Sequence, residues 1–469
     1  MKKLIFLCGA LLLATSVFAQ SDDDLFGGSD DDFFADDSIV EVDDVSAKTD
    51  LSKGVIFDSG TVKVGGSLTA SIGTNTILYS PDSTDFGENL KNTTLKPELS
   101  ALLSVDARPS QNLRMYTKFG FAYPFASSVS AYSKYGATPE LQGFDSDLNP
   151  IIGTTVNTSF SDWFKLKELF TDFSIKETAF FRFGIHTVTW GTGYFFSPVS
   201  DMINTSSIDP ENPEFQVDGA LNLRTQIVFP DSQNCLWLYV IPSTDFAGQT
   251  AETYLRDTAF AAKADVLLGN CELGVGAFYK YQNAPKVMLT ATGSLKKVSF
   301  FGEFVYSYGS STEWTKNTDW DDKSNIFQAT VGLNYYWKEP MISLAAQYYF
   351  NGNTKDLEGY VIGGHNIAAM VGFGKVFGTK DFSASLFAMA NFGREEFTDE
   401  ALAGMKMAGA DDATIAAVSG TSLTTTAMLF YSPINELKVG MGPSLTFKSF
   451  DKNPTISLKL SATLGGGNF

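Results

Sequence analysis

Cysteine and histidine are scarce in this chain of 469 residues, which contains three cysteines and two histidines. So few cysteines cannot build a disulfide-dense scaffold. Motifs typical of metal and nucleotide sites, such as CxxC, HExxH and a Walker loop, are also absent. We therefore expect no metal site and no cofactor.

Long apolar runs are missing as well. After the N-terminus no segment holds eighteen consecutive apolar residues, which excludes a membrane-spanning helix on length. Yet 44% of the chain is hydrophobic and 14% is aromatic, with 40 Phe and 18 Tyr. Something other than water should therefore cover part of its surface.

Basic residues are outnumbered, with 34 Lys and Arg against 53 Asp and Glu and a formal charge of −19. Nucleic-acid binding needs clustered Lys and Arg, so we expect no nucleic-acid partner.

The N-terminus has the pattern of a secretory signal peptide. Lys2 and Lys3 precede an apolar run over residues 4–13, and Ala19 provides a small residue for cleavage. We expect residues 1–19 to be removed and the mature chain to begin at Gln20.

Residues 20–50 carry twelve acidic residues and one lysine. Self-repulsion and the shortage of groups to bury predict a disordered periplasmic leader over residues 20–58. A spacer role and a docking role both remain open, because the apolar pairs Leu25-Phe26 and Phe33-Phe34 each follow an acidic triplet.

From residue 59 to residue 469 the pattern is a series of short segments with period-two hydrophobicity. In one of them Leu113, Met115 and Phe119 share one face, while Arg114 and Lys118 share the other. This alternation predicts strands. The predicted strands are 61–74, 96–108, 113–123, 166–176, 180–190, 220–229, 235–242, 257–268, 271–281, 286–294, 298–309, 325–337, 340–350, 363–377, 382–392, 423–433, 437–449 and 454–464.

Short and long connections alternate along this series. Tight turns such as residues 269–270 alternate with longer loops such as 124–165, 191–219 and 393–422. This rhythm is typical of an all-β transmembrane antiparallel β-barrel whose short turns face the periplasm. We predict about 18 strands (range 14–18), in the outer membrane of a diderm bacterium.

Aromatic residues at many strand ends suit the two interfacial girdles of such barrels, although ordinary β-propensity is an alternative explanation. The chain ends at Phe469, and a terminal aromatic is the usual signal for the barrel assembly machinery. The apolar face of the last strand is out of parity with Phe469, so we expect a bulge at residues 465–467.

One stretch resembles porin-like outer-membrane proteins. Residues 168–173 read Glu-Leu-Phe-Thr-Asp-Phe, residues 181–191 read Phe-Arg-Phe-Gly-Ile-His-Thr-Val-Thr-Trp-Gly, and Ser197-Pro198, Asp201 and Pro210 follow in the loop. The resemblance covers about residues 168–219 and implies a membrane channel without naming a solute. Because of it, we expect the loop 191–219, rather than 124–165, to fold into the lumen.

A catalytic function would require a histidine with a partner, and the two histidines lie far apart in the predicted strand order. His186 shares a face with Arg182 and is predicted to line the pore, whereas His365 is predicted to be solvated at a loop edge. We therefore predict no catalytic residues and no enzyme.

Charged residues on the polar strand faces predict a mildly cationic lumen, although mixed charges are common in any wide pore. The basic candidates are Arg114, Lys118, Arg182, Arg224, Lys280, Lys438, Lys448 and Lys459, and the acidic candidates are Asp106, Glu168, Asp172 and Glu303.

The function that fits these features is passive diffusion of small hydrophilic solutes through a porin, since eighteen strands leave an aqueous channel. A surface adhesin or structural barrel and a transporter of hydrophobic substrates remain alternatives. The expected partners are outer-membrane lipid, the assembly machinery and the solutes, and a homo-oligomer is left open.

Overall fold

A computed structural model describes the chain over sixteen stretches. These are residues 55–81, 85–91, 93–123, 140–144, 150–153, 164–176, 178–188, 190–203, 220–230, 232, 234–243, 250–353, 364–392, 421–434, 436–448 and 453–468. The predictions for the signal peptide, for the leader up to residue 54 and for Phe469 lie outside these residues.

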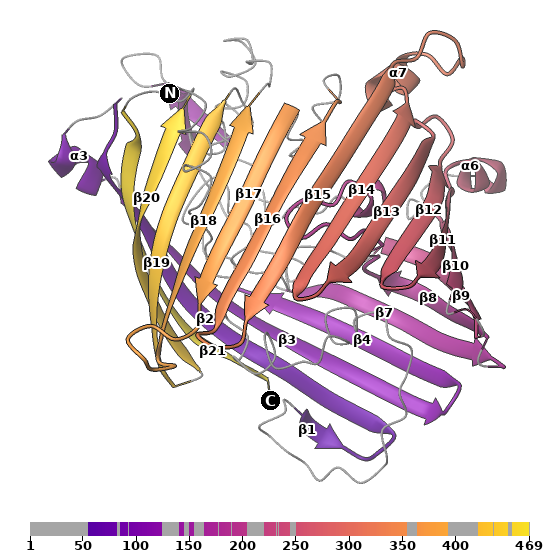
Figure 1. Ribbon diagram of the computed structural model, residues 1–469, viewed down its shortest axis with the longest axis horizontal. Coiled ribbons are helices and arrows are strands. Elements are labelled where there is room, and N and C mark those ends of the chain that lie inside the picture. The colour runs from indigo at the N-terminus through magenta and orange to yellow at the C-terminus, as the bar shows by residue number, and fades with distance from the viewer. Residues whose placement is uncertain are drawn as a thin grey trace.

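The fold is a closed antiparallel β-barrel of 18 strands (Figure 1), which confirms the predicted fold class and strand number. Each predicted strand is present, with shifts of a few residues at its ends. The strands are β2 (Val62–Tyr79), β3 (Thr94–Ser110), β4 (Leu113–Ala122), β7 (Phe164–Ile175), β8 (Ala179–His186), β9 (Ala220–Phe229), β10 (Asn234–Ile241), β11 (Ala259–Leu268), β12 (Cys271–Tyr279), β13 (Lys286–Leu295), β14 (Val298–Tyr308), β15 (Asn325–Trp337), β16 (Ile342–Asn351), β17 (Gly364–Phe373), β18 (Phe382–Phe392), β19 (Ser422–Ile434), β20 (Leu437–Lys448) and β21 (Thr455–Asn468).

The barrel closes where β21 pairs with β2, and the predicted bulge lies at this seam. Thr69 is opposite Gly465 whereas Ser67 is opposite Asn468, so β21 has one extra residue there. A further short strand, β1 (Val55–Asp58), pairs with β2 at residues 63–65, beyond the end of β21. The strand at 55–58 differs from the prediction of a disordered leader extending to residue 58.

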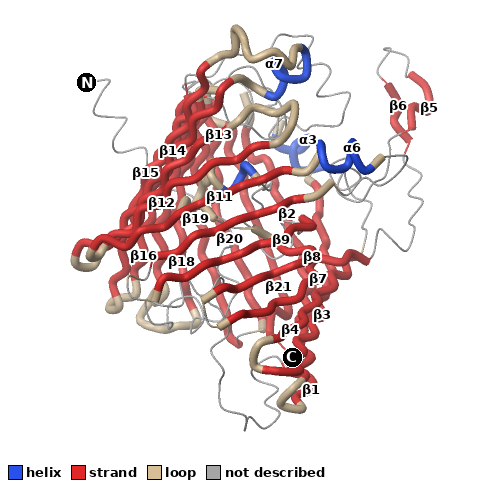
Figure 2. The backbone as a smooth tube through the Cα atoms, turned by 90° about the vertical axis from the view of Figure 1, so that its right-hand side faces the viewer, coloured by secondary structure: helices blue, strands red, loops and turns tan. Residues whose placement is uncertain are grey.

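Long and short connections separate to opposite ends of the barrel. Connections such as 111–112, 269–270 and 296–297 are tight turns at one end. The connections at the other end contain α3 (Phe86–Lys91), α6 (Ala251–Arg256), α7 (Ser311–Lys316) and the hairpin of β5 (Glu140–Phe144) and β6 (Pro150–Gly153). Figure 2 shows the helices and the hairpin at this loop end, away from the tight turns.

Side chains alternate between the two faces of the wall, as the period-two pattern predicts. On β15, Val331 points outward with 59% of its surface exposed, whereas its neighbour Thr330 points inward and is 1% exposed. Most exposed large hydrophobic side chains of the strands lie on the outward face. An apolar outer wall of this kind is suited to contact with lipid.

Aromatic residues mark both edges of the outward face. On β15, Phe327 lies near the loop end and Trp337 near the turn end, and both rings are exposed. Ten residues at about 3.4 Å each, tilted by about 40°, separate them by roughly 26 Å along the barrel axis. That spacing matches the apolar band of about 25 Å expected for an outer-membrane barrel.

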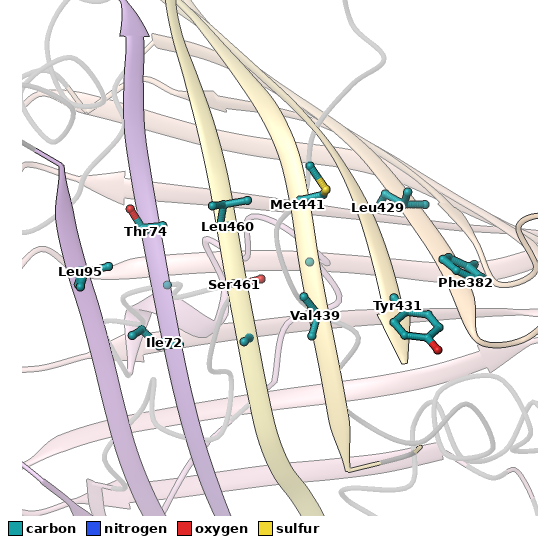
Figure 3. Close-up of a pocket in the computed structure, with 13 residues that line it drawn as sticks. Ile72, Thr74, Leu95, Phe382, Leu429, Tyr431, Val439, Met441, Leu460 and Ser461 are labelled. Atoms are coloured by element: carbon teal, nitrogen blue, oxygen red, sulfur yellow. The ribbon is translucent and has the colours of Figure 1, made fainter. Parts of the chain in front are cut away.

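The outward face also contains a shallow apolar hollow that crosses the closing seam (Figure 3). Leu95 of β3, Ile72 of β2, Leu460 of β21 and Met441 of β20 lie on its walls. Small residues such as Ala462 leave the space between these larger side chains.

Among the described residues the two cysteines, Cys235 at the start of β10 and Cys271 at the start of β12, are free, and the strand β11 separates their strands. Within the described residues, no helix is both long and apolar enough to cross a membrane. The same residues contain no group of three or more His, Cys, Asp or Glu that could hold a metal ion.

The assignment of faces can be tested at two adjacent residues near the middle of β2. Ile72 points outward and is 46% exposed, whereas Ser71 is on the inward face. We expect Ile72→Arg to destabilise the protein folded in bilayers by about 2–4 kcal/mol, and Ser71→Arg to destabilise it much less. Denaturant titration in lipid vesicles measures both, and equal costs would show that the strand register is wrong by one residue.

Candidate functional site

The chain turns into the barrel after β8. This strand ends at His186, whereas the sequence predicted a strand to residue 190. From Trp190 onward the chain packs against the inner wall, where Trp190, Val199 and Met202 form a buried cluster with Tyr239 and Val305. The segment 190–203, called the inner loop below, is visible inside the barrel behind β14–β16 in Figure 1. Within its described residues, the prediction that this loop folds inward is confirmed.

Glu303 of β14 holds the inner loop through its carboxylate. Its Oε1 accepts hydrogen bonds from the backbone N–H groups of Thr192 and Gly193 (2.6 Å for Gly193) and from Ser197 Oγ (2.9 Å). Its Oε2 accepts one from the N–H of Val199 (2.9 Å). These four hydrogen bonds satisfy the buried carboxyl group and fix the inner loop to the wall.

Gln347 of β16 forms a second attachment. Its Oε1 accepts from the N–H groups of Phe195 (2.6 Å) and Phe196 (3.2 Å), and its Nε2 donates to the Phe196 carbonyl (2.6 Å) and to Thr330 Oγ1 (2.5 Å). Both lone pairs of the amide oxygen and both N–H groups of the amide nitrogen are therefore used.

A buried ion pair forms the third attachment. Lys263 of β11 lies 3.0 Å from Asp265 Oδ1, and its ammonium donates to the carbonyl of Trp190 (3.1 Å). Asp265 also accepts from the indole N–H of Trp237 (2.8 Å). The first residue of the inner loop is thereby attached to the wall far from Gln347.

Aromatic packing fills the space between these attachments. Phe196 stacks on Tyr349 at 5.3 Å, and Phe195 meets the edge of Phe387 at 5.3 Å. The indole N–H of Trp190 donates to the Val199 carbonyl at 2.7 Å, which closes the loop on itself. The inner loop thus lies against β11, β14, β16 and β18.

The glycine of the Trp190-Gly191 pair is explained by this packing. A Cβ on Gly191 would overlap Ser197 Oγ and the Glu303 carboxylate, so a larger residue would displace these two groups from each other. In the neighbouring strand, Gly184 has φ +138° and lies against the backbone of Leu169. Both glycines of the porin-like sequence pattern therefore allow close backbone approach.

Strands β3, β4, β7 and β8 carry a chain of ion pairs on their inward face. Asp106 pairs with Arg108 (3.2 Å) and with Arg114 (3.0 Å). Arg114 also approaches Asp172 (3.5 Å), which receives both Nε (2.7 Å) and an Nη (3.1 Å) of Arg182. The charges alternate along the wall, and none of these strands is among those that hold the inner loop.

An aromatic ring supports this chain of charges. The guanidinium of Arg182 lies 4.1 Å from the ring centroid of Phe170, and that of Arg114 lies 5.7 Å from the same ring. Stacking of this kind fixes the planar groups while leaving their edges to solvent.

The other residues that the sequence predicts to line the pore lie either at accessible or at covered positions of the barrel. Lys118 is opposite Glu168 across β4 and β7, Lys438 lies 4.3 Å above the Phe430 ring, and Lys448 is exposed at the end of β20. Lys280 follows β12, and Lys459 lies within β21.

Three candidates lie on the inward face but are covered. Glu303 is 3% exposed beneath the inner loop, and His186 is 1% exposed with its ring edge-on to Phe170. Arg224 is 7% exposed and lies above Trp237. The prediction that these side chains line an open pore must be corrected, because packing covers each of them.

His365 also differs from its prediction as a solvated residue. Its Nδ1 lies 2.6 Å from Tyr348 Oη, and its ring stacks on Phe392 at 5.2 Å. It belongs to the outward aromatic edge at the loop end.

Sequence reasoning did not identify Gln347, Lys263 or Asp265. Each is a polar residue at a position that alternation assigns to the lumen, and nothing local distinguishes a covered polar residue from a solvated one.

No protein-family model and no curated protein matches this chain. Among solved structures, OccK3 (OpdO) of Pseudomonas aeruginosa is 9% identical, with 86% of this chain and 95% of that chain covered and a TM-score of 0.49. OccK9 (OpdG) of the same organism is 9% identical, with 86% and 98% covered and a TM-score of 0.48. The outer membrane channel DcaP of Acinetobacter baumannii is 11% identical, with 88% and 99% covered and a TM-score of 0.41. Identities this low carry no information on substrate.

The role of Glu303 can be tested by removing its carboxylate. Glu303→Ala leaves up to four donors without an acceptor, at a cost of about 1–3 kcal/mol for each one that stays buried. We expect the inner loop to leave the wall, which would make single-channel currents noisier and change their amplitude. Asp106→Ala is the matched control, because this inward carboxylate contacts Arg108 and Arg114 rather than the loop. Quiet currents of unchanged amplitude in Glu303→Ala would contradict this role.

Proposed function

We propose that this protein is a non-enzymatic outer-membrane porin through which small hydrophilic solutes diffuse passively. The observation that carries the proposal is the division of the lumen between two walls. One wall holds the inner loop through Glu303 and Gln347, and the other presents the ion-pair chain. An 18-stranded barrel leaves an aqueous channel that such a loop narrows without filling.

Outer-membrane location is part of the proposal and is supported by the outward apolar band. Its height of roughly 26 Å between aromatic edges fits the hydrocarbon region of this membrane. We further propose export through the signal peptide 1–19, an acidic leader on the periplasmic side, and recognition of Phe469 by the assembly machinery.

The ion-pair wall favours a mild anion preference. Arg108, Arg114, Lys118 and Arg182 oppose Asp106, Glu168 and Asp172, so the group carries 4 − 3 = +1 charge. A narrow aqueous channel with low-dielectric walls focuses this field on passing ions. Because we propose that the leader is on the periplasmic side, we expect its acidic residues to contribute little to this field.

A surface adhesin is the alternative from a different functional class, since the loop end carries long connections. Planar bilayers separate the two, because a channel conducts and an adhesin with a plugged lumen conducts little.

Ion selectivity tests the role of the charged wall. Replacing Arg114, Lys118 and Arg182 by glutamine in one variant changes the net charge of the group from +1 to 1 − 3 = −2, because only Arg108 then opposes Asp106, Glu168 and Asp172. We expect the reversal potential under a salt gradient to shift from weak anion preference to cation preference.

Deletion of residues 20–50 is the control and should leave the reversal potential nearly unchanged. Cation preference in the intact protein, or no response to the triple substitution, would refute the proposed selectivity.

A further inference from the structure

The loop 309–324 between β14 and β15 is held in a defined conformation by its own side chains. Ser310 and Glu313 form a reciprocal capping box at the start of α7. The indole N–H of Trp314 donates to the Tyr308 carbonyl (2.8 Å), and the ring is only 4% exposed. Lys323 covers that ring at 4.8 Å and donates to the Glu313 carbonyl (3.2 Å). The loop therefore presents its remaining side chains in fixed positions.

Trp320 is the large side chain that this loop leaves exposed. Its ring stacks on Tyr308 (6.2 Å between centroids, 17° between planes) and meets the edge of Trp314 at 5.1 Å. The Tyr308 hydroxyl donates to the Trp320 carbonyl at 2.7 Å. Despite these contacts, 57% of Trp320 is exposed.

The position of Tyr308 shows which way Trp320 points. Val305 and Ser307 of β14 are buried on the inward face, at 0% and 5% exposure, so the alternating residues Tyr306 and Tyr308 face outward. Because Trp320 stacks on Tyr308, the loop returns the indole to the outer side of the wall.

Trp320 thereby extends the outward aromatic edge. Tyr306 packs on Phe327 at 5.3 Å, and Phe304 lies 6.1 Å from the same ring. Trp and Tyr combine an apolar ring with a polar group, and they favour the boundary between lipid headgroups and acyl chains. The exposed carboxylates of Asp319 and Asp321 beside Trp320 would keep it at headgroup depth.

We propose that Trp320 is a membrane anchor carried by a loop, which binds the boundary between headgroups and acyl chains in the leaflet at the loop end. The anchor rests on the membrane location given under the proposed function. It would fix the depth and tilt of the barrel on the side of β14 and β15, where the loop continues the aromatic edge beyond the strands.

Depth-dependent fluorescence quenching tests this anchor. The full-length protein and its Trp320→Phe variant are folded into phosphatidylcholine vesicles that carry a nitroxide at the headgroup, at a shallow acyl position or at the middle of the chain. We expect the emission lost in Trp320→Phe to be the part quenched most by the headgroup and shallow nitroxides, less by the mid-chain nitroxide and weakly by aqueous iodide.

Two matched variants give the reference values. Trp314→Phe removes a buried indole, so the emission it loses should be protected from iodide. Trp337→Phe removes an exposed indole at the turn end, which should respond to shallow nitroxides like Trp320. Phenylalanine keeps a ring at each site, and Trp320→Tyr replaces Trp320→Phe if that variant does not fold.

The outcomes separate the two proposals. If the Trp320 emission is quenched by iodide and by no nitroxide while the Trp337 emission responds to lipid, the anchor is refuted and the membrane location stands. If neither indole responds to any nitroxide, the membrane location itself is refuted.

Discussion

Backbone pairing around the closed ring of strands is the constraint on which the rest of this structure depends. In hydrocarbon, every backbone donor and acceptor must be satisfied within the protein, so an open sheet edge is not tolerated. Here the first and last barrel strands meet, and β2 pairs with β21 from Ser67 to Tyr79. The seam requires Gly465, which has φ +102° and no room for a Cβ beside the Leu68 carbonyl.

The width of the closed barrel explains why part of its interior is occupied by the inner loop. Wall side chains fill the interior of a barrel of about eight strands but cannot fill one of eighteen. The chain narrows the lumen with backbone, whose polar groups must then find partners inside the barrel. Glu303 and Gln347 supply acceptors for the N–H groups of five loop residues: Thr192, Gly193, Phe195, Phe196 and Val199. Because these attachments lie on one side, the ion-pair wall of Asp106 to Arg182 keeps its face toward the lumen.

The strands, their faces and the two ends of the barrel could be predicted from the sequence, since period-two hydrophobicity and turn chemistry are local signals. The contacts inside the barrel, between the wall and the inner loop, could not be predicted from the sequence. Glu303 was predicted as a lumen charge, and its position on the inward face is right, but its cover comes from a segment more than a hundred residues away in sequence. Strand β8 was predicted four residues too long, because Trp190 belongs to the loop cluster although it fits a strand pattern. Trp320 lies outside the predicted strands, and the direction in which its side chain points follows only from the folded loop.

The proposed function requires this barrel to enclose a water-filled path of limited width. Liposome swelling tests it most directly, with the purified protein in vesicles that are diluted into isotonic solutions of sugars of increasing size. We expect rapid swelling with the smallest sugars and a steep fall in the swelling rate as solute size approaches the width left by the inner loop. No swelling with any solute, in vesicles where the barrel is folded, would contradict it.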